Sequence, residues 1–225
     1  MNTLYEYLES KENKFRQHSF FRNLKSVDSL SQLALVAAQL SFWVMSFQDL
    51  LRLNIEQVQD KKLSRLLRCH QTEDAGHEEW FLHDLAVMQI AEPRLRTLYS
   101  QTHTPTRDAT YFVLAQVFEA QSDHERIALL LTIESAAQVF FSQVADFSER
   151  LKVSKDLMYF SNHHLNAEES HDSLDHDMEN CLNRMWLTED KKRIVYSLID
   201  RVYHAFSILF DHFNATLVEN LSVSV

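Results

Sequence analysis

The chain has 225 residues, a formal net charge of -10 at pH 7, one glycine and two prolines. Proteins rich in β-structure need many glycine-bearing turns, whereas long helices joined by few loops need almost none, so this composition excludes a β-rich fold and predicts an all-α protein. The acidic balance argues against nucleic-acid binding, because a phosphate backbone is held by clustered Lys and Arg side chains.

The length allows one large domain or two small ones, and the scarcity of loop-forming residues favours a single domain spanning 1–225. Two cysteines, Cys69 and Cys181, are too few for a disulfide framework and suit a reducing compartment. The amino terminus carries charges where a signal peptide needs an apolar run, and no 18-residue stretch is uninterruptedly apolar. We therefore expect a soluble, cytoplasmic protein that is not attached to a membrane.

The first predicted elements are helices. Residues 3–25 form one polar helix or two short ones. Asp28 or Ser29 can cap the next helix, which runs to about residue 58. Its apolar residues recur at helical spacing and cover a broad face, which predicts a core helix that is buried on two sides.

A third helix, predicted from about residue 62 to residue 91, carries the motif HQTEDAGH at 70–77. On a continuous helix the side chains of His70, Asp74 and His77 fall within roughly 60° of one another. Apolar residues precede and follow them on the same face, so we expect these polar groups to be buried and held by partners or a metal. Glu73, near the edge of that face, is an alternative carboxylate.

Gly76 lies inside this predicted helix, where glycine costs about 1 kcal/mol relative to alanine. Close approach of a neighbouring helix or a ligand would explain its presence. Glu79 and His83 point about the opposite way and are expected on the surface.

Pro93 ends the third helix, and residues 93–107 are predicted to be a connection with one short helical turn. One helix follows from Asp108 to about residue 120, and another runs from a cap at Ser122 or Asp123 to about residue 151. Glu134 lies on a very apolar face of the latter. A buried carboxylate needs a cation, which is either a metal or an Arg or Lys from another helix.

A helix capped by Ser154 is predicted to carry HLNAEESH at 164–171, which repeats the first spacing with His164, Glu168 and His171. Thr188 can cap a last helix that reaches about residue 220. If the two motif helices face each other, both polar trios enter one space. Neutral imidazole and carboxylate are ligand types of iron, manganese and zinc, so this pattern predicts a metal site.

With Glu134 added, the ordered set resembles the haem-oxygenase-like di-iron oxidases and oxygenases, over about residues 18–215. In that family the first core helix supplies a carboxylate and, seven residues later, a histidine. The second supplies a Glu, and the third supplies His-x3-Asp-x2-His. The matching residues here are His77, Glu134, His164, Glu168 and His171.

Two positions depart from the family pattern. His70 stands at the position of the first carboxylate, for which Glu73 or Asp74 can substitute, and Glu168 stands where the family has Asp. The resemblance implies a bundle of about seven helices, two iron ions or alternatively manganese, and O2 and a small organic molecule as reactants. A homodimer is a further possibility.

Three alternatives stay open. The first is a metal-free relative of the same fold, such as a thiaminase-like hydrolase or a cofactorless oxidase, although the hydrolases use a pocket cysteine and Cys69 and Cys181 lie off the motif faces. The second is a helical binding protein with structural histidines. The third is a ferritin-like topology, which shares the acid-x-x-His motif but needs a further Glu from each of two other helices, where only Glu134 is well placed.

Overall fold

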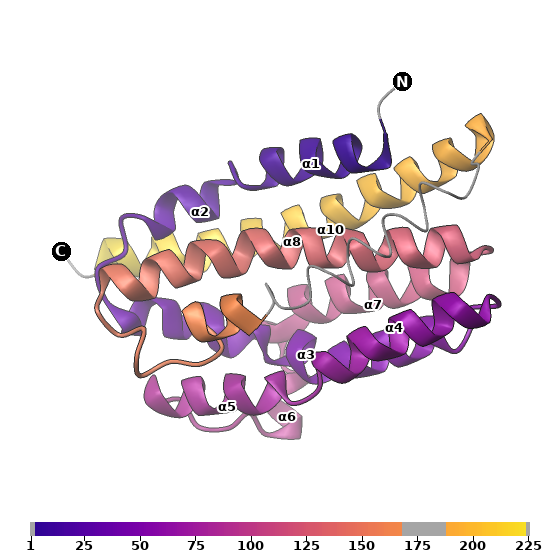
Figure 1. Ribbon diagram of the computed structural model, residues 1–225. Helices are drawn as coiled ribbons and strands as arrows, with labels where there is room; N and C mark the ends of the chain where they lie inside the picture. The colour runs from indigo at the N-terminus through magenta and orange to yellow at the C-terminus, as the bar shows by residue number, and fades with distance from the viewer. Residues whose placement is uncertain (1–2, 168–187, 224–225) are drawn as a thin grey trace.

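The computed structural model describes residues 3–167 and 188–223. All regular elements within these ranges are helices, which confirms the all-α prediction (Figure 1). In chain order they are α1 (Leu4–Phe15), α2 (Ser19–Leu24), α3 (Leu30–Ile55), α4 (Lys61–Glu73), α5 (His77–Val87), α6 (Leu95–Leu98), the 3-10 helix η1 (Gln101–His103), α7 (Thr104–Glu119), α8 (Asp123–Arg150) and α10 (Glu189–Val223).

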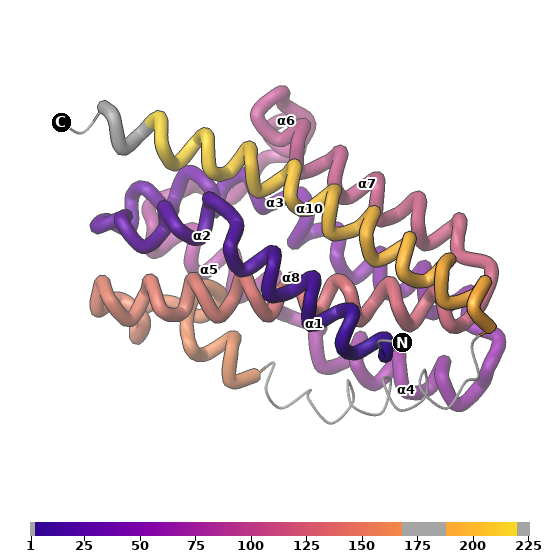
Figure 2. Tube along the Cα trace, turned by 90° about the horizontal axis from the view of Figure 1, so that it is seen from above, coloured from indigo at the N-terminus to yellow at the C-terminus, as the bar shows by residue number. Residues whose placement is uncertain are grey.

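The long helices α3, α8 and α10 form the centre of the bundle. Helix α10 packs against α8, α7, α3, α2 and α1, and Figure 2 shows α1 lying along α8 and α10. Helices α3 and α8 each contain an 18-residue window of mean hydropathy 1.5, and 56% and 67% of these windows are buried within the bundle. Such burial is typical of the core helices of a bundle, whose apolar faces pack on neighbours.

An aromatic cluster ties the two N-terminal helices to α10. The ring centroid of Phe210 lies 5.0 Å from that of Phe15 and 5.2 Å from those of both Phe20 and Phe21. All of these rings are buried, and most of the contacts are edge-to-face, which is a favoured geometry for aromatic pairs. This cluster packs α1 and α2 against α10.

The predicted third helix is in fact two helices, and the prediction of one continuous helix was wrong. Helix α4 ends at Glu73, and α5 begins at His77 after a break at Gly76, whose φ of 96° lies in the left-handed region. Glycine reaches this region without the steric penalty of a side chain. A Cβ at Gly76 would meet no atom within 4 Å, so its conformation, and not close approach, explains the glycine.

The helix of the second motif also begins later than predicted. Residues 151–161 form turns, and regular helix starts at 162. The Asp84 carboxylate accepts hydrogen bonds from the backbone N–H groups of Met158 and Phe160, at 2.7 and 2.8 Å, so these groups are satisfied by a side chain and not by a helix. The Ser161 hydroxyl, and not Ser154, accepts from the N–H of His163 at the helix start.

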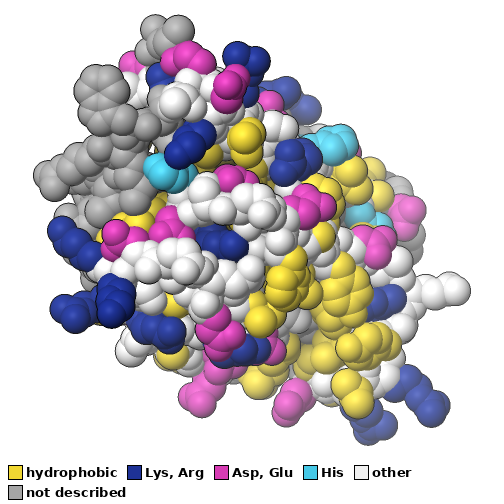
Figure 3. Space-filling view, turned by 90° about the vertical axis from the view of Figure 1, so that its right-hand side faces the viewer, with side chains coloured by type: hydrophobic (Ala, Val, Ile, Leu, Met, Phe, Trp, Pro, Cys, Tyr) yellow, Lys and Arg dark blue, Asp and Glu magenta, His cyan; other side chains and the backbone are white. Residues whose placement is uncertain are grey.

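Other boundaries agree with the sequence to within a few residues. Helices α6 and η1 lie in the predicted 93–107 connection, and α7 begins four residues before the predicted start at Asp108. The Thr188 hydroxyl accepts from the N–H of Lys191 at the start of α10, as predicted. Figure 3 shows one end of the molecule, where side chains of both charges are interspersed and hydrophobic side chains gather at one edge.

Candidate metal centre

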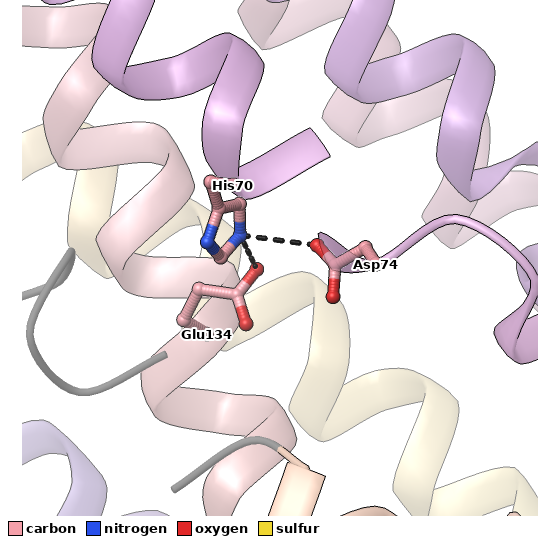
Figure 4. Close-up of side chains that lie close together, drawn as sticks. All are labelled: His70, Asp74 and Glu134. Atoms are coloured by element: carbon pink, nitrogen blue, oxygen red, sulfur yellow. Dashed lines mark hydrogen bonds and ion pairs between the residues drawn. The ribbon is translucent and has the colours of Figure 1, made fainter. Parts of the chain in front are cut away.

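Three ligand-type side chains meet where α4 ends beside the middle of α8 (Figure 4). His70 lies in the last turn of α4, Asp74 is the residue that follows this helix, and Glu134 projects from α8. The His70 Nε2 atom lies 3.1 Å from Asp74 Oδ2 and 3.2 Å from Glu134 Oε1. One ligand atom from each residue lies within 4.8 Å of the others, so a single ion could contact all three.

Local sequence explains why these groups are buried. On α4, Leu63 and Leu67 are buried on the same face as His70, so packing of this apolar face carries the imidazole into the bundle. Glu134 lies next to Ile133 in the most apolar part of α8. The side chains of His70, Asp74 and Glu134 are 1%, 3% and 11% exposed, respectively. These polar groups are therefore largely withdrawn from water, as the sequence predicted for the first motif.

The charge of His70 is set by its two carboxylate neighbours. Burial on its own lowers the pKa of His70, but the charge of Glu134, hydrogen bonds to Asp74 and Glu134, and the charge of Asp74 together raise the pKa to about 12. The metal-free protein therefore holds an imidazolium between two carboxylates. A metal cation would supply the same positive charge, and His70 would then bind it as neutral imidazole.

Two further histidines extend the cluster. His77 is the first residue of α5, and its Nδ1 atom lies 3.7 Å from Asp74 Oδ1. Its ring centroid lies 4.6 Å from that of His164 in an edge-on arrangement, and Trp80 stacks on the His77 ring at 4.3 Å. Residues from the first motif, from α8 and from the start of the second motif thus lie together, as expected if the two motifs share one space.

The orientation of His164 is fixed by a backbone hydrogen bond. Its Nδ1 atom lies 3.1 Å from the carbonyl oxygen of Tyr159. A carbonyl only accepts hydrogen bonds, so Nδ1 carries the proton and the Nε2 atom of a neutral imidazole has a lone pair for a ligand. The ring packs against Phe141, with centroids 3.8 Å apart, and Tyr159, at 4.6 Å. Such a bond from the second ring nitrogen is common among metal-binding histidines.

Of the other predicted ligands, Glu73 lies in the described part of the chain. Glu73 is exposed, so Asp74 is the first-motif carboxylate that faces His70. Glu168 and His171 lie outside the described residues. Glu79 and His83 are exposed, as the sequence predicted.

Sequence reasoning missed three residues that shape the site: Trp80, Tyr159 and Asp84. Asp84 had a visible signal, because a carboxylate between the apolar residues of α5 is expected to be buried and satisfied. It is 0% exposed.

The cluster forms part of the wall of a cavity of about 90 Å³. The polar lining includes Asp74, His77, Glu134 and His164, and the rest is mostly aromatic and aliphatic side chains from α3, α8 and α10. A water molecule needs only about 10–15 Å³ of such cavity volume, so the cavity has room for several waters or a small organic molecule.

Comparisons with known proteins bear on the fold. No protein-family model matches this chain, and no curated protein matches it. Among solved structures, the chain is similar to a domain of unknown function with a haem oxygenase-like fold from Shewanella denitrificans. The TM-score is 0.70 at 14% sequence identity, and the match covers 93% of this chain and 90% of that chain. The chain therefore has a haem oxygenase-like fold, as its sequence pattern predicted.

Proposed function

From a haem oxygenase-like fold that buries imidazole and carboxylate groups beside a cavity, we propose that this protein is a non-haem metal-dependent oxidoreductase. It would hold two iron ions, or alternatively manganese, and use O2 to oxidise a small organic molecule. The observation that supports this most is the meeting of His70, Asp74 and Glu134 with His77 and His164, of which all but His70 line the cavity.

The donor set fits these metals. Imidazole and carboxylate are suitable ligands for iron and manganese, and no thiolate lies among the lining residues of the cavity that the structure describes. The two oxygens of Asp74 face different histidines, Oδ2 toward His70 and Oδ1 toward His77. Asp74 would thus be the carboxylate that contacts both ions. It would take the role of the carboxylate that the family pattern has at position 70.

When bound, the metal would supply one-electron redox chemistry and a binding position for O2. The chain's own residues would do three things. His70, Asp74, Glu134, His77 and His164 would hold the ions. Aromatic rings such as those of Trp80 and Phe141, which pack against His77 and His164, would keep water from the reacting groups. The cavity would position the substrate.

Metal analysis tests the proposal directly. Protein produced with iron and manganese available should retain close to stoichiometric metal, and His70→Ala and His164→Ala should lose it. The control is His204→Ala, because His204 is exposed on α10 and is not part of the cavity lining. Consumption of O2 by anaerobically prepared iron(II) protein should follow metal content across these variants. Equal metal content in all of them would rule out the proposed ligands.

A non-catalytic binding protein is the second candidate. The observation that favours it is the position of His70 between Asp74 and Glu134, because a protonated His70 would balance their charge without a metal. In that case wild-type protein would retain no metal. A hydrolase with a cysteine nucleophile gains no support from Cys69, which is exposed and does not line the cavity, and Cys181 lies outside the described residues.

A further inference from the structure

The lining of the cavity combines a few ionisable side chains with many apolar ones. The ionisable ones include Asp74, His77, Glu134 and His164. Among the apolar ones, α3 contributes Leu40, Val44 and Phe47, and α10 contributes Phe206, Phe210 and Phe213. Several of these apolar side chains belong to the core of the bundle and are almost fully buried, so the cavity reaches into the core.

Three helices indicate the length of the cavity. Its lining runs from Leu40 to Gln48 on α3, from Ile133 to Phe141 on α8, and from Phe206 to Phe213 on α10. These stretches advance seven or eight residues, which is about 10 to 12 Å at 1.5 Å per residue of helix. The cavity lining therefore extends along the bundle by about two helical turns.

The charges in the wall restrict how a molecule can be recognised. Among the lining residues that the structure describes there is no Lys or Arg, while Asp74, Glu78 and Glu134 are all present. The described lining is mostly apolar, so most of the binding energy is expected to come from apolar surface.

We infer that this site takes a molecule with an apolar body about 10 Å long, such as an unbranched alkyl chain, that lies along α8 with its reacting position against the cluster. The assignment of this molecule as a substrate rests on the proposed function. The binding of this molecule to the cavity does not depend on the proposed function, because the apolar walls are present whether or not metal is bound. The two ideas can thus fail separately.

Uncharged 1-alkanols of six to twelve carbons are suitable probes, since they avoid any effect of head-group charge. Calorimetric titration of metal-free protein should show affinity rising about fourfold with each added methylene group. The rise should level off near eight or nine carbons, because about that many bonds, each advancing about 1.25 Å along an extended chain, span the cavity. Affinity that does not depend on chain length would overturn the inference.

Variants on α8 and α3 provide a matched test. Ala137 lines the cavity and is partly buried, so Ala137→Leu should fill space and weaken octanol binding at least tenfold. Ala38 is also partly buried but does not line the cavity, so Ala38→Leu should bind octanol like wild type. Unchanged octanol affinity in a folded Ala137→Leu protein, verified by circular dichroism, would exclude the cavity as the binding site.

A third variant tests the length limit. Phe206 packs edge-on against Trp43 in the wall, with ring centroids 5.3 Å apart. Phe206→Ala should move the levelling-off point to longer alcohols, and an unchanged limit would contradict the assigned walls. Metal content is measured on the same samples. Loss of octanol binding with metal retained counts against this inference alone, and chain-length-dependent binding in a protein that retains no metal counts against the proposed function alone.

Discussion

The two candidate functions assign different roles to Glu134. Its Oε1 atom lies 3.2 Å from His70, and it is placed 64 residues further along the chain. In a metal centre this carboxylate is a ligand, whereas in a metal-free protein it is the counter-charge of an imidazolium. In both cases its negative charge is what matters, since the side chain is only 11% exposed.

Glu134→Gln keeps the shape of the side chain and removes the charge. If Glu134 is a ligand, metal content should fall by about half or more, because one of the carboxylates near the ions is lost. The free energy of unfolding of the metal-free variant should also be lower by about 1–3 kcal/mol, since the hydrogen bond from His70 then goes to a neutral amide and not to a carboxylate.

Metal analysis and chemical denaturation of this variant supply both measurements. Asp146→Asn is the matched control, because Asp146 is exposed on the same helix. A lower stability with unchanged metal content would remove Glu134 from the centre and leave it as a partner of His70.

At the scale of elements, Asp84 connects α5 to the turns that precede the second motif. It accepts backbone hydrogen bonds from Met158 and Phe160, and the carbonyl of Tyr159, between these two residues, accepts from His164. This chain of contacts makes Asp84 a positioning residue. It holds the segment that orients the imidazole without touching the cavity itself.

Asp84→Asn should therefore lower both stability and metal affinity. The amide has one acceptor oxygen where the carboxylate has two, so at least one buried N–H loses its partner, at a cost of about 1–3 kcal/mol. The effect on metal would come through the position of His164, so His164→Ala should add little to the loss in a double variant. Glu79→Gln, at an exposed position of the same helix, should change neither quantity. Full additivity of the two metal losses would contradict the positioning role.

At the scale of the whole molecule, the aromatic cluster joins α1 and α2 to α10. Phe21 is 1% exposed and its ring lies 5.4 Å from Phe15 and 5.2 Å from Phe210. Phe21→Ala should cost about 3–5 kcal/mol of unfolding free energy, because it removes a large buried side chain and leaves a cavity. Denaturant titration measures this cost. Phe118→Ala, which truncates a side chain that is 57% exposed, should change the stability by much less, and equal losses would show that the cluster does not stabilise the bundle.

The sequence predicted the fold better than the local geometry of the site. Composition and apolar spacing predicted the all-α bundle and most helix boundaries, because these depend on patterns that repeat over many residues. The break at Gly76 was missed because an isolated glycine is compatible both with a costly helix interior and with a left-handed turn. The turns at 151–161 were missed because two of their backbone N–H groups bond to Asp84, which is 74 residues from Met158 and cannot be paired with it from local sequence.

The sequence predicted that His70 and His77 lie close together, but it did so by assuming one continuous helix without a break at Gly76. On one continuous helix, seven residues would place His70 and His77 on the same face. In the molecule they belong to two helices and still point to the same space. The convergence therefore depends on the turn as much as on the spacing, and the separation of seven residues alone does not determine it.

The chain cannot be cut between α5 and α6 without separating the residues of the cluster. His70, Asp74 and His77 precede the connection between α5 and α6, whereas Glu134 and His164 follow it. A cut in that connection would produce two fragments, and neither would contain the whole cluster. Only reassociation of the fragments would restore the distances from His70 to Glu134 and from His77 to His164. Any property that depends on the cluster would then report fragment complementation.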